Sequence, residues 1–135
     1  MMFRVSRHRP LSGNNAIMDH YKLVLTEHIN HYGHLFGGNL LNWIDEFAYI
    51  TASIEFPKNR FVTVALDNVE FRHGIELGEV LRFCVERMTT GKTSVSYKVR
   101  VFGTVKADDF SKILFSTSVT FVNVDVDGQK KTILD

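Results

Sequence analysis

One short stretch of the chain holds two features that chemistry would use: the pair Gly37 and Gly38, and the carboxylate of Asp45. The glycines open a segment with helical periodicity, and the start of a helix leaves free backbone N–H groups at the positive end of its dipole. Because glycine lets a ligand approach the backbone closely, these N–H groups suit a developing oxyanion or a phosphate. A glycine N-cap that simply permits tight packing explains the same residues, so both interpretations stay open here.

Asp45 is the unusual residue of that helical segment. On a wheel that advances about 100° per residue from Leu40, Asp45 falls at the margin of the apolar arc, whereas Glu46 falls in the middle of the polar side. We therefore expect Asp45 to be half-buried and Glu46 to be solvated. A carboxylate at an apolar margin can act as a base or as a nucleophile. A structural carboxylate that bonds a loop or a neighbouring subunit is an equal alternative.

A second candidate lies at residues 91–94, in a predicted turn between two strands. The turn combines a cation, two hydroxyl groups and a flexible backbone, which together can bind a phosphate or the amides of a pantetheine chain. An ordinary hairpin turn is the alternative. The four residues of the turn are Gly91, Lys92, Thr93 and Ser94, and the cations expected near the same edge are Arg60, Arg72 and His73.

Three histidines, His28, His31 and His34, are spaced by three residues. In a helix this spacing would place them on one face, where they would suit a metal ion. The neighbouring glycines and Asn30 favour a loop instead, and no carboxylate completes a ligand set, so we expect no metal. Cys84 is the only cysteine, which excludes an intrachain disulfide, and we expect it to be a buried and inert residue.

The elements that would position these residues follow from hydrophobic periodicity. Apolar residues recur with a period of about 3.6 over residues 39–55, which predicts one long helix with a wide apolar face. Pro57 disfavours helical geometry at Phe56 and so ends the helix. Residues 21–25 predict a short strand, and the polar segment 26–38 predicts a loop.

After Pro57 the period changes to two, which predicts four long strands joined by short connectors that favour antiparallel neighbours. The expected fold class is therefore α+β, with a single helix against one face of the sheet. Alternate residues such as Thr63 are expected to face away from the helix, toward water or a partner subunit. Because the sheet edges also need protection, we expect two copies to pair edge to edge, as a dimer at least. The strands are expected around residues 62–67, 81–86, 94–101 and 113–121.

The composition bounds the class of protein. The chain has 135 residues, of which 44% are hydrophobic and 23% charged, and its formal net charge is +1. These values predict one ordinary domain, over residues 20–135, and argue against a bulk binder of nucleic acid. No apolar run approaches the ~20 residues of a membrane helix, so we expect a soluble cytoplasmic protein that binds no membrane. Residues 1–19 carry arginines but no secretory apolar block, and we expect them to form a flexible tail.

Residues 30–46 resemble the active-site segment of hotdog-fold acyl-CoA thioesterases, of the acyl-CoA hydrolase family. Three further blocks follow in the family's order: residues 62–71 resemble one of its strands, 91–94 its glycine-containing turn, and 121–128 its last strand and tail. The residues in register within the first block are Asn30, Gly33, Leu35, Phe36, Gly37, Gly38, Leu41, Trp43, Asp45 and Glu46. The sequence departs from the family pattern at His28 and Ile29, where Asp-Thr is usual, and at Gly74, where proline is usual.

The resemblance implies a hotdog fold, in which one long central helix is wrapped by a five-stranded antiparallel sheet, and two copies form one continuous sheet. It also implies a thioester site between subunits. There Asn30 and the backbone N–H of Gly37 hold the thioester carbonyl, while Asp45 of the facing subunit acts as general base or nucleophile. The substrate is an acyl-CoA, no metal or redox cofactor is required, and the assembly is a dimer, tetramer or hexamer. The residues expected to bind substrate are Phe36, Gly38, Arg72, Gly91, Lys92, Thr93 and Ser94.

Two other functions stay open. A hotdog domain can bind acyl-CoA without hydrolysing it, as a non-catalytic module. It can also hydrate or dehydrate acyl chains, but such sites pair a catalytic histidine with an acid, and Phe36 stands immediately before Gly37 here.

Overall fold

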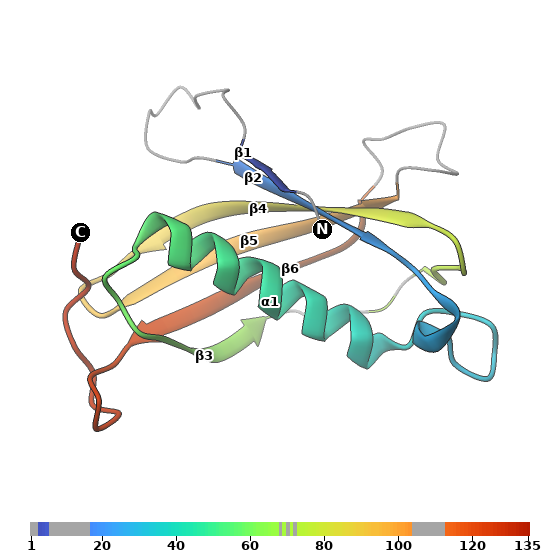
Figure 1. Cartoon of the computed structure of the whole chain (residues 1–135). Helices are drawn as coiled ribbons and strands as arrows, with labels where there is room; N and C mark the ends of the chain where they lie inside the picture. Colours follow the sequence, from blue (N-terminus) through green and yellow to red (C-terminus); the bar gives the residue numbers. More distant parts are fainter. Residues whose placement is uncertain (1–2, 6–16, 68, 70, 72, 104–112) are drawn as a thin grey trace.

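Helix α1 (Gly37–Glu55) lies along one face of an antiparallel sheet in the computed structural model (Figure 1). The structure describes residues 3–5, 17–67, 69, 71, 73–103 and 113–135. Within these residues the sheet has the strand order β1-β2-β4-β5-β6-β3, and every neighbouring pair is antiparallel. The strands are β1 (Phe3–Val5), β2 (Ile17–Leu23), β3 (Phe61–Asp67), β4 (Val80–Thr90), β5 (Ser94–Gly103) and β6 (Ile113–Asn123), and a short 3-10 helix, η1 (Thr26–His28), follows β2.

This architecture confirms the expected α+β fold with one long helix against an antiparallel sheet. The five expected strands are β2 to β6, and β1 is a short sixth strand that pairs with β2. Strand β2 begins at Ile17, ahead of the expected start at Tyr21, because its pairing with β4 extends from Leu23 back to Ile17. Parts of the segment 1–19 thus lie in the sheet, while the division into a tail and one domain over 20–135 stays a prediction.

The wide apolar face of α1 is buried against the sheet, as its periodicity predicts. Phe47 and Ile44 are almost fully buried, and they pack on the helix-facing side chains of the central strands, such as Phe83 and Val99. Burying each such side chain stabilises the fold by about 1.5–3 kcal/mol relative to exposure. The helix ends at Glu55, with Phe56 in a non-helical conformation directly before Pro57. No helix among the described residues is long and apolar enough to span a membrane.

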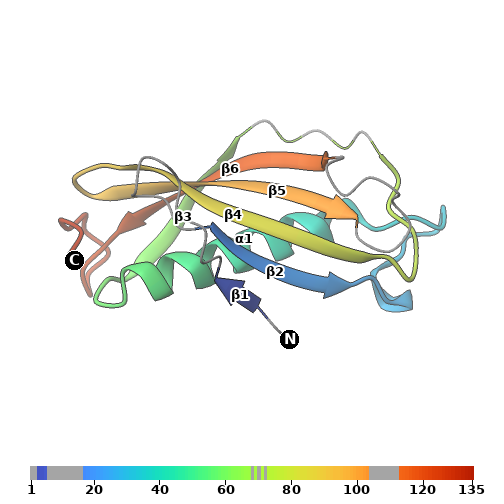
Figure 2. The ribbon, with the colours of Figure 1, turned by 90° about the horizontal axis from the view of Figure 1, so that it is seen from above.

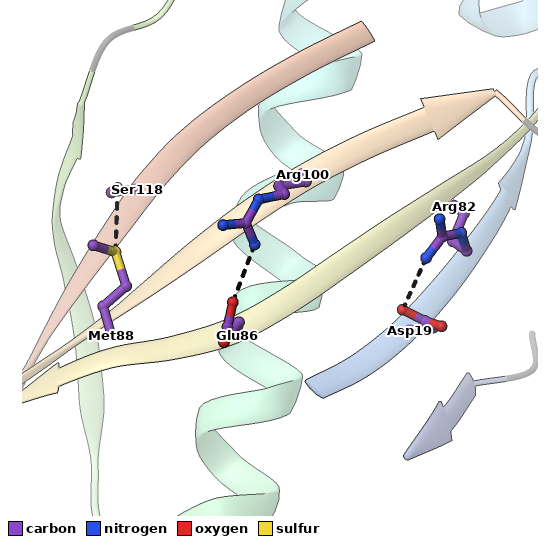
Figure 3. A network of polar contacts seen from close by, with 6 residues as sticks. All are labelled: Asp19, Arg82, Glu86, Met88, Arg100 and Ser118. Atoms are coloured by element: carbon purple, nitrogen blue, oxygen red, sulfur yellow. Dashed lines mark hydrogen bonds and ion pairs between the residues drawn. The ribbon is translucent and has the colours of Figure 1, made fainter. Parts of the chain in front are cut away.

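The opposite face of the sheet carries paired charges (Figure 3). Arg82 lies 3.6 Å from Asp19, and Arg100 donates a hydrogen bond of 3.1 Å to Glu86. Cys84 is buried among them, and its burial raises the pKa of its thiol to about 11. The thiol therefore stays protonated at neutral pH, which agrees with the expected inert residue.

Strand β3 departs from the expected alternation. Phe61 is buried and Thr63 turns toward α1, whereas Val62 and Val64 are 42% and 56% exposed. The expectation that Thr63 faces away from the helix is therefore wrong. The physical reason is that β3 is the outer strand next to β6, with a bulge between Thr63 and Ala65 that shifts its register. Its free edge and its two exposed valines suit pairing with another strand.

His20 gives the fold a testable dependence on pH. Its ring is fully buried, stacks on Phe47 and lies 3.0 Å from the hydroxyl of Thr51, and burial lowers its pKa to about 4. Since the unfolded chain binds this proton near pH 6.5, stability is fully present above that pH and falls as the pH drops toward 4. Between about pH 7.5 and pH 5 we expect His20 to remove about 2 kcal/mol from the free energy of unfolding, measured by urea denaturation.

The matched control for this prediction is His20→Gln, which keeps a polar side chain but does not titrate in this range. Its free energy of unfolding should change less between the two pH values than that of the wild type. An equal change in both proteins would assign the acid sensitivity to other groups.

Candidate active site

The loop between β2 and α1 is held in place by backbone hydrogen bonds to residues 73–79. The N–H of Leu35 donates to the carbonyl of Ile75 at 2.6 Å, and the N–H of Gly78 donates to the carbonyl of Val24 at 2.9 Å. A β-bridge also joins His34 to Glu76. Two segments that are far apart in sequence therefore form one wall next to the N-terminal end of α1.

Asn30 sits in a tight turn of this loop that orients its carboxamide. Its Oδ1 accepts hydrogen bonds from the backbone N–H groups of Tyr32 at 2.9 Å and of His34 at 3.1 Å. Gly33 supports the turn with a φ of 86°, a conformation that side chains disfavour. Because Oδ1 is engaged, the free end of the carboxamide is its donor, and Nδ2 has no acceptor among the described residues.

Gly37 presents a second unused donor. It is the first residue of α1, and its N–H has no acceptor among the described residues, as expected for the start of a helix. A Cβ atom at this position would lie 2.9 Å from the ring of Phe71. A larger residue here would therefore displace the exposed ring of Phe71.

Asn30 and Gly37 meet in one pocket of about 330 Å³ beside the start of α1. Two histidines already considered from the sequence, His34 and His73, complete its wall together with apolar residues. His34 lies directly over Gly74, where a Cβ would come within 2.6 Å of the imidazole, so glycine in place of the usual proline leaves room for this ring. The lining residues are Asn30, His34, Leu35, Gly37, Leu40, Phe71, His73, Gly74 and Ile75.

Asp45 lies outside this pocket, farther along α1. It is half-buried and Glu46 is exposed, which confirms the positions expected from the helical wheel. Eight residues separate Asp45 from Gly37, which corresponds to about 12 Å along a helix axis. One small reacting group therefore cannot contact both residues of the same chain.

Thr63 holds the Asp45 carboxylate in position. Its Oγ1 donates a hydrogen bond of 2.6 Å to Asp45 Oδ1, and Asp45 forms no ion pair among the described residues. A carboxylate that is held by a hydroxyl and not neutralised by a cation keeps its charge available for chemistry. The sequence reasoning missed Thr63 as a site residue; the strand block 62–71 contained the signal, but the phase of this strand was read incorrectly.

The remaining predicted residues are distributed over both ends of the molecule. Phe36 and Gly38 flank Gly37 and are exposed, but they do not line the pocket, and Arg72 lies outside the described residues. The turn 91–94 joins β4 to β5 at the end where α1 finishes, far from the loop that carries Asn30 (Figures 1 and 2). Its role, like that of the other proposed site residues, stays a prediction.

The expected grouping of cations at this turn is wrong for His73 but agrees with the position of Arg60. His73 lines the pocket at the start of α1, whereas Arg60 lines a separate hollow next to the C-terminal segment, at the end of the molecule that holds the turn. Strand β3, Phe61–Asp67, separates the two residues and spans about 20 Å. Within the described residues, no group of three or more His, Cys, Asp or Glu side chains is arranged to hold a metal ion.

Comparisons of sequence give one consistent family. Residues 32–104 match the family model described as the thioesterase superfamily. A curated relative from Buchnera aphidicola, named an uncharacterized acyl-CoA thioester hydrolase, is 31% identical over 115 residues, which cover 83% of this chain and 84% of the relative.

Comparisons of structure agree. An acyl-CoA hydrolase from Staphylococcus aureus, solved in complex with butyryl coenzyme A, superposes with a TM-score of 0.72 and 28% identity, over 87% of this chain and 68% of that one. Alanine variants of an aspartate, an asparagine and a threonine of that protein have also been solved. A hexameric acyl-CoA thioesterase solved in its apo form gives a TM-score of 0.76 and 31% identity, over 87% of this chain and 74% of that one.

Proposed function

This chain belongs to the thioesterase superfamily of thioester hydrolases, and from that membership we propose that it hydrolyses acyl-CoA to a free acid and CoA. The observation that carries the proposal is the pair of unused donors in one pocket, the Nδ2 amide of Asn30 and the backbone N–H of Gly37. Two donors from residues that line the same pocket suit the oxygen of a thioester carbonyl, which gains negative charge as the carbonyl carbon is attacked.

The positive end of the α1 dipole adds to this stabilisation. Gly37 is the first residue of a long helix and lines the pocket, so its N–H carries the partial positive charge of the helix start. The donors are held by the turn at Asn30 and by the helix itself, so they need little reorganisation as charge develops.

Asp45 supplies the other half of the reaction in our proposal. Either it removes a proton from a water molecule that attacks the carbonyl carbon, or it attacks that carbon itself and the resulting anhydride is hydrolysed. In both cases the C–S bond breaks, CoA leaves as a thiolate, and a proton that originates from water neutralises the thiolate. Water is the only co-reactant, so no metal or redox cofactor is needed.

The separation of Asp45 from Gly37 within one chain supports a site that is shared between two copies. The free edge of β3 and the exposed Val62 and Val64 offer the surface for pairing, and Thr63, which holds Asp45, lies on that same strand. We propose a dimer as the smallest active unit. The hexameric state of the similar apo enzyme favours an assembly of three such dimers.

A thiol-release screen tests the proposed function. The purified protein is incubated with acyl-CoAs of short, medium, long and aromatic acyl groups, and released CoA is measured with a thiol reagent. We expect turnover of at least one acyl class, without added metal and in the presence of a chelator. Tight binding of acyl-CoA with no thiol release from any member of the panel would contradict the proposed hydrolase and indicate a non-catalytic binding module.

A further inference from the structure

We infer that a hollow lined by three cations, at the end of the molecule opposite the Asn30 pocket, binds the phosphate groups of the CoA nucleotide. This inference rests on the proposed function. The hollow has a volume of about 310 Å³ and lies where the turn after α1, the end of β6 and the C-terminal segment meet. Its lining residues are Lys58, Arg60, Asn123, Val124, Asp125, Val126 and Lys131.

The three cations of this hollow have no anionic partner among the residues that the structure describes. Lys58 and Arg60 lie in the turn after α1 and Lys131 lies in the C-terminal segment, and none of the three forms an ion pair among the described residues. Asp125 is the one carboxylate in the lining, and its Oδ1 already accepts the backbone N–H groups of Asp127 and Gln129. Gathering like charges costs free energy, which an anion in the hollow would offset.

The backbone that carries these cations is fixed by buried and paired amides. Asn123 is 1% exposed; its Oδ1 accepts the N–H of Arg60 at 2.8 Å, and its Nδ2 donates to the carbonyl of Thr132. Asn59 forms two hydrogen bonds of 2.7 Å with the backbone of Leu134. The segment before β3, the end of β6 and the C-terminal segment are thereby tied together, so the cations line the hollow from a preorganised frame.

The position of the hollow fits a CoA thioester that reacts at Asp45. Arg60 precedes Thr63 by three residues, which corresponds to about 10 Å of extended chain. The hydroxyl of Thr63 in turn donates a hydrogen bond to Asp45. The pantetheine arm of CoA carries two amides in series and is longer than this distance, so it can join a thioester at Asp45 to phosphates in the hollow. The turn 91–94 lies next to the hollow, because the carbonyl of Lys92 accepts the N–H of Ile133.

The test compares two substrates that differ only in the nucleotide. Kinetics are measured with one acyl-CoA and with the matching acyl-pantetheine, which has no phosphate. For Arg60→Gln, and for Lys58→Gln combined with Lys131→Gln, we expect KM for the acyl-CoA to rise about tenfold or more with little change in kcat. Neither variant should change KM for the acyl-pantetheine.

Lys130→Gln is the matched control, because Lys130 is exposed and adjacent in sequence but does not line the hollow. It should behave as the wild type with both substrates. An unchanged KM for acyl-CoA in the hollow variants, or an equal rise for both substrates, would overturn the inference.

Calorimetric titration with CoA separates this inference from the proposed function. If the wild type releases no thiol but binds CoA, and the hollow variants bind it at least tenfold more weakly, the phosphate site stands while the hydrolase fails. If inorganic phosphate at the same concentration as CoA displaces CoA from the protein, the hollow is an unspecific anion site and the assignment to CoA is wrong.

Discussion

Asp45→Asn is expected to lower kcat by about 10²–10⁴-fold, the range that a positioned general base contributes. The asparagine amide neither removes a proton from water nor attacks a carbonyl carbon. It can still accept the hydrogen bond from Thr63 through its Oδ1, so the side chain should keep its place. We therefore expect the melting temperature and the affinity for acyl-CoA to stay close to those of the wild type, measured by calorimetry.

Glu46→Gln provides the matched control for this variant. It makes the same chemical change at the next residue, but Glu46 is exposed on the polar side of α1. Its kcat should differ from that of the wild type by less than about twofold, as for most surface substitutions. If Asp45→Asn hydrolyses acyl-CoA at the wild-type rate, Asp45 is not the base or nucleophile.

Asn30→Asp is expected to lower kcat by about 10²–10³-fold, the usual cost of losing one donor to an oxyanion. Aspartate retains the Oδ1 that accepts the N–H groups of Tyr32 and His34, so the turn should persist. The Nδ2 donor, however, is replaced by a second carboxylate oxygen, which repels the charge that develops on the thioester carbonyl. The measurement is the kcat of the variant with the best substrate of the thiol-release screen.

Asn30→Ala separates the two roles of this side chain. It removes both the donor and the acceptor of the turn, so it should lose activity and also lower the melting temperature. In contrast, Asn30→Asp should lose activity with the melting temperature nearly unchanged. Full activity in Asn30→Asp would show that Nδ2 does not contact the carbonyl oxygen.

The helix and the central strands were predictable from sequence because elements with one buried face repeat their apolar residues with a regular period. Residues 39–55 repeat with the helical period and Pro57 marks their end, so α1 was placed within two residues at its start. Strands β4, β5 and β6 lie between neighbours on both sides and alternate between the core and the outer face. Asp45 was located for the same reason, since its position relative to Leu40 follows from helical geometry alone.

The edge strand and the loop carried weaker local signals. At β3 the apolar Val62 and Val64 are exposed while Thr63 donates a hydrogen bond to Asp45 on α1, because that strand is at the edge of the described sheet and has a bulge. Pattern alone assigned the opposite phase. Asn30 owes its orientation to hydrogen bonds with Tyr32 and His34, and a polar loop has no period that predicts them. Its proposed role follows only from the family resemblance.

The distance between Gly37 and Asp45 along α1 has a genetic consequence. If each catalytic centre combines the donors of one copy with the carboxylate of another, then the Asp45→Asn and Asn30→Asp chains are defective in opposite halves. Co-assembly of these two inactive proteins would create one centre that is wholly intact beside another that is doubly damaged. Activity would thus reappear on mixing, a complementation between alleles that a centre contained within a single polypeptide cannot produce.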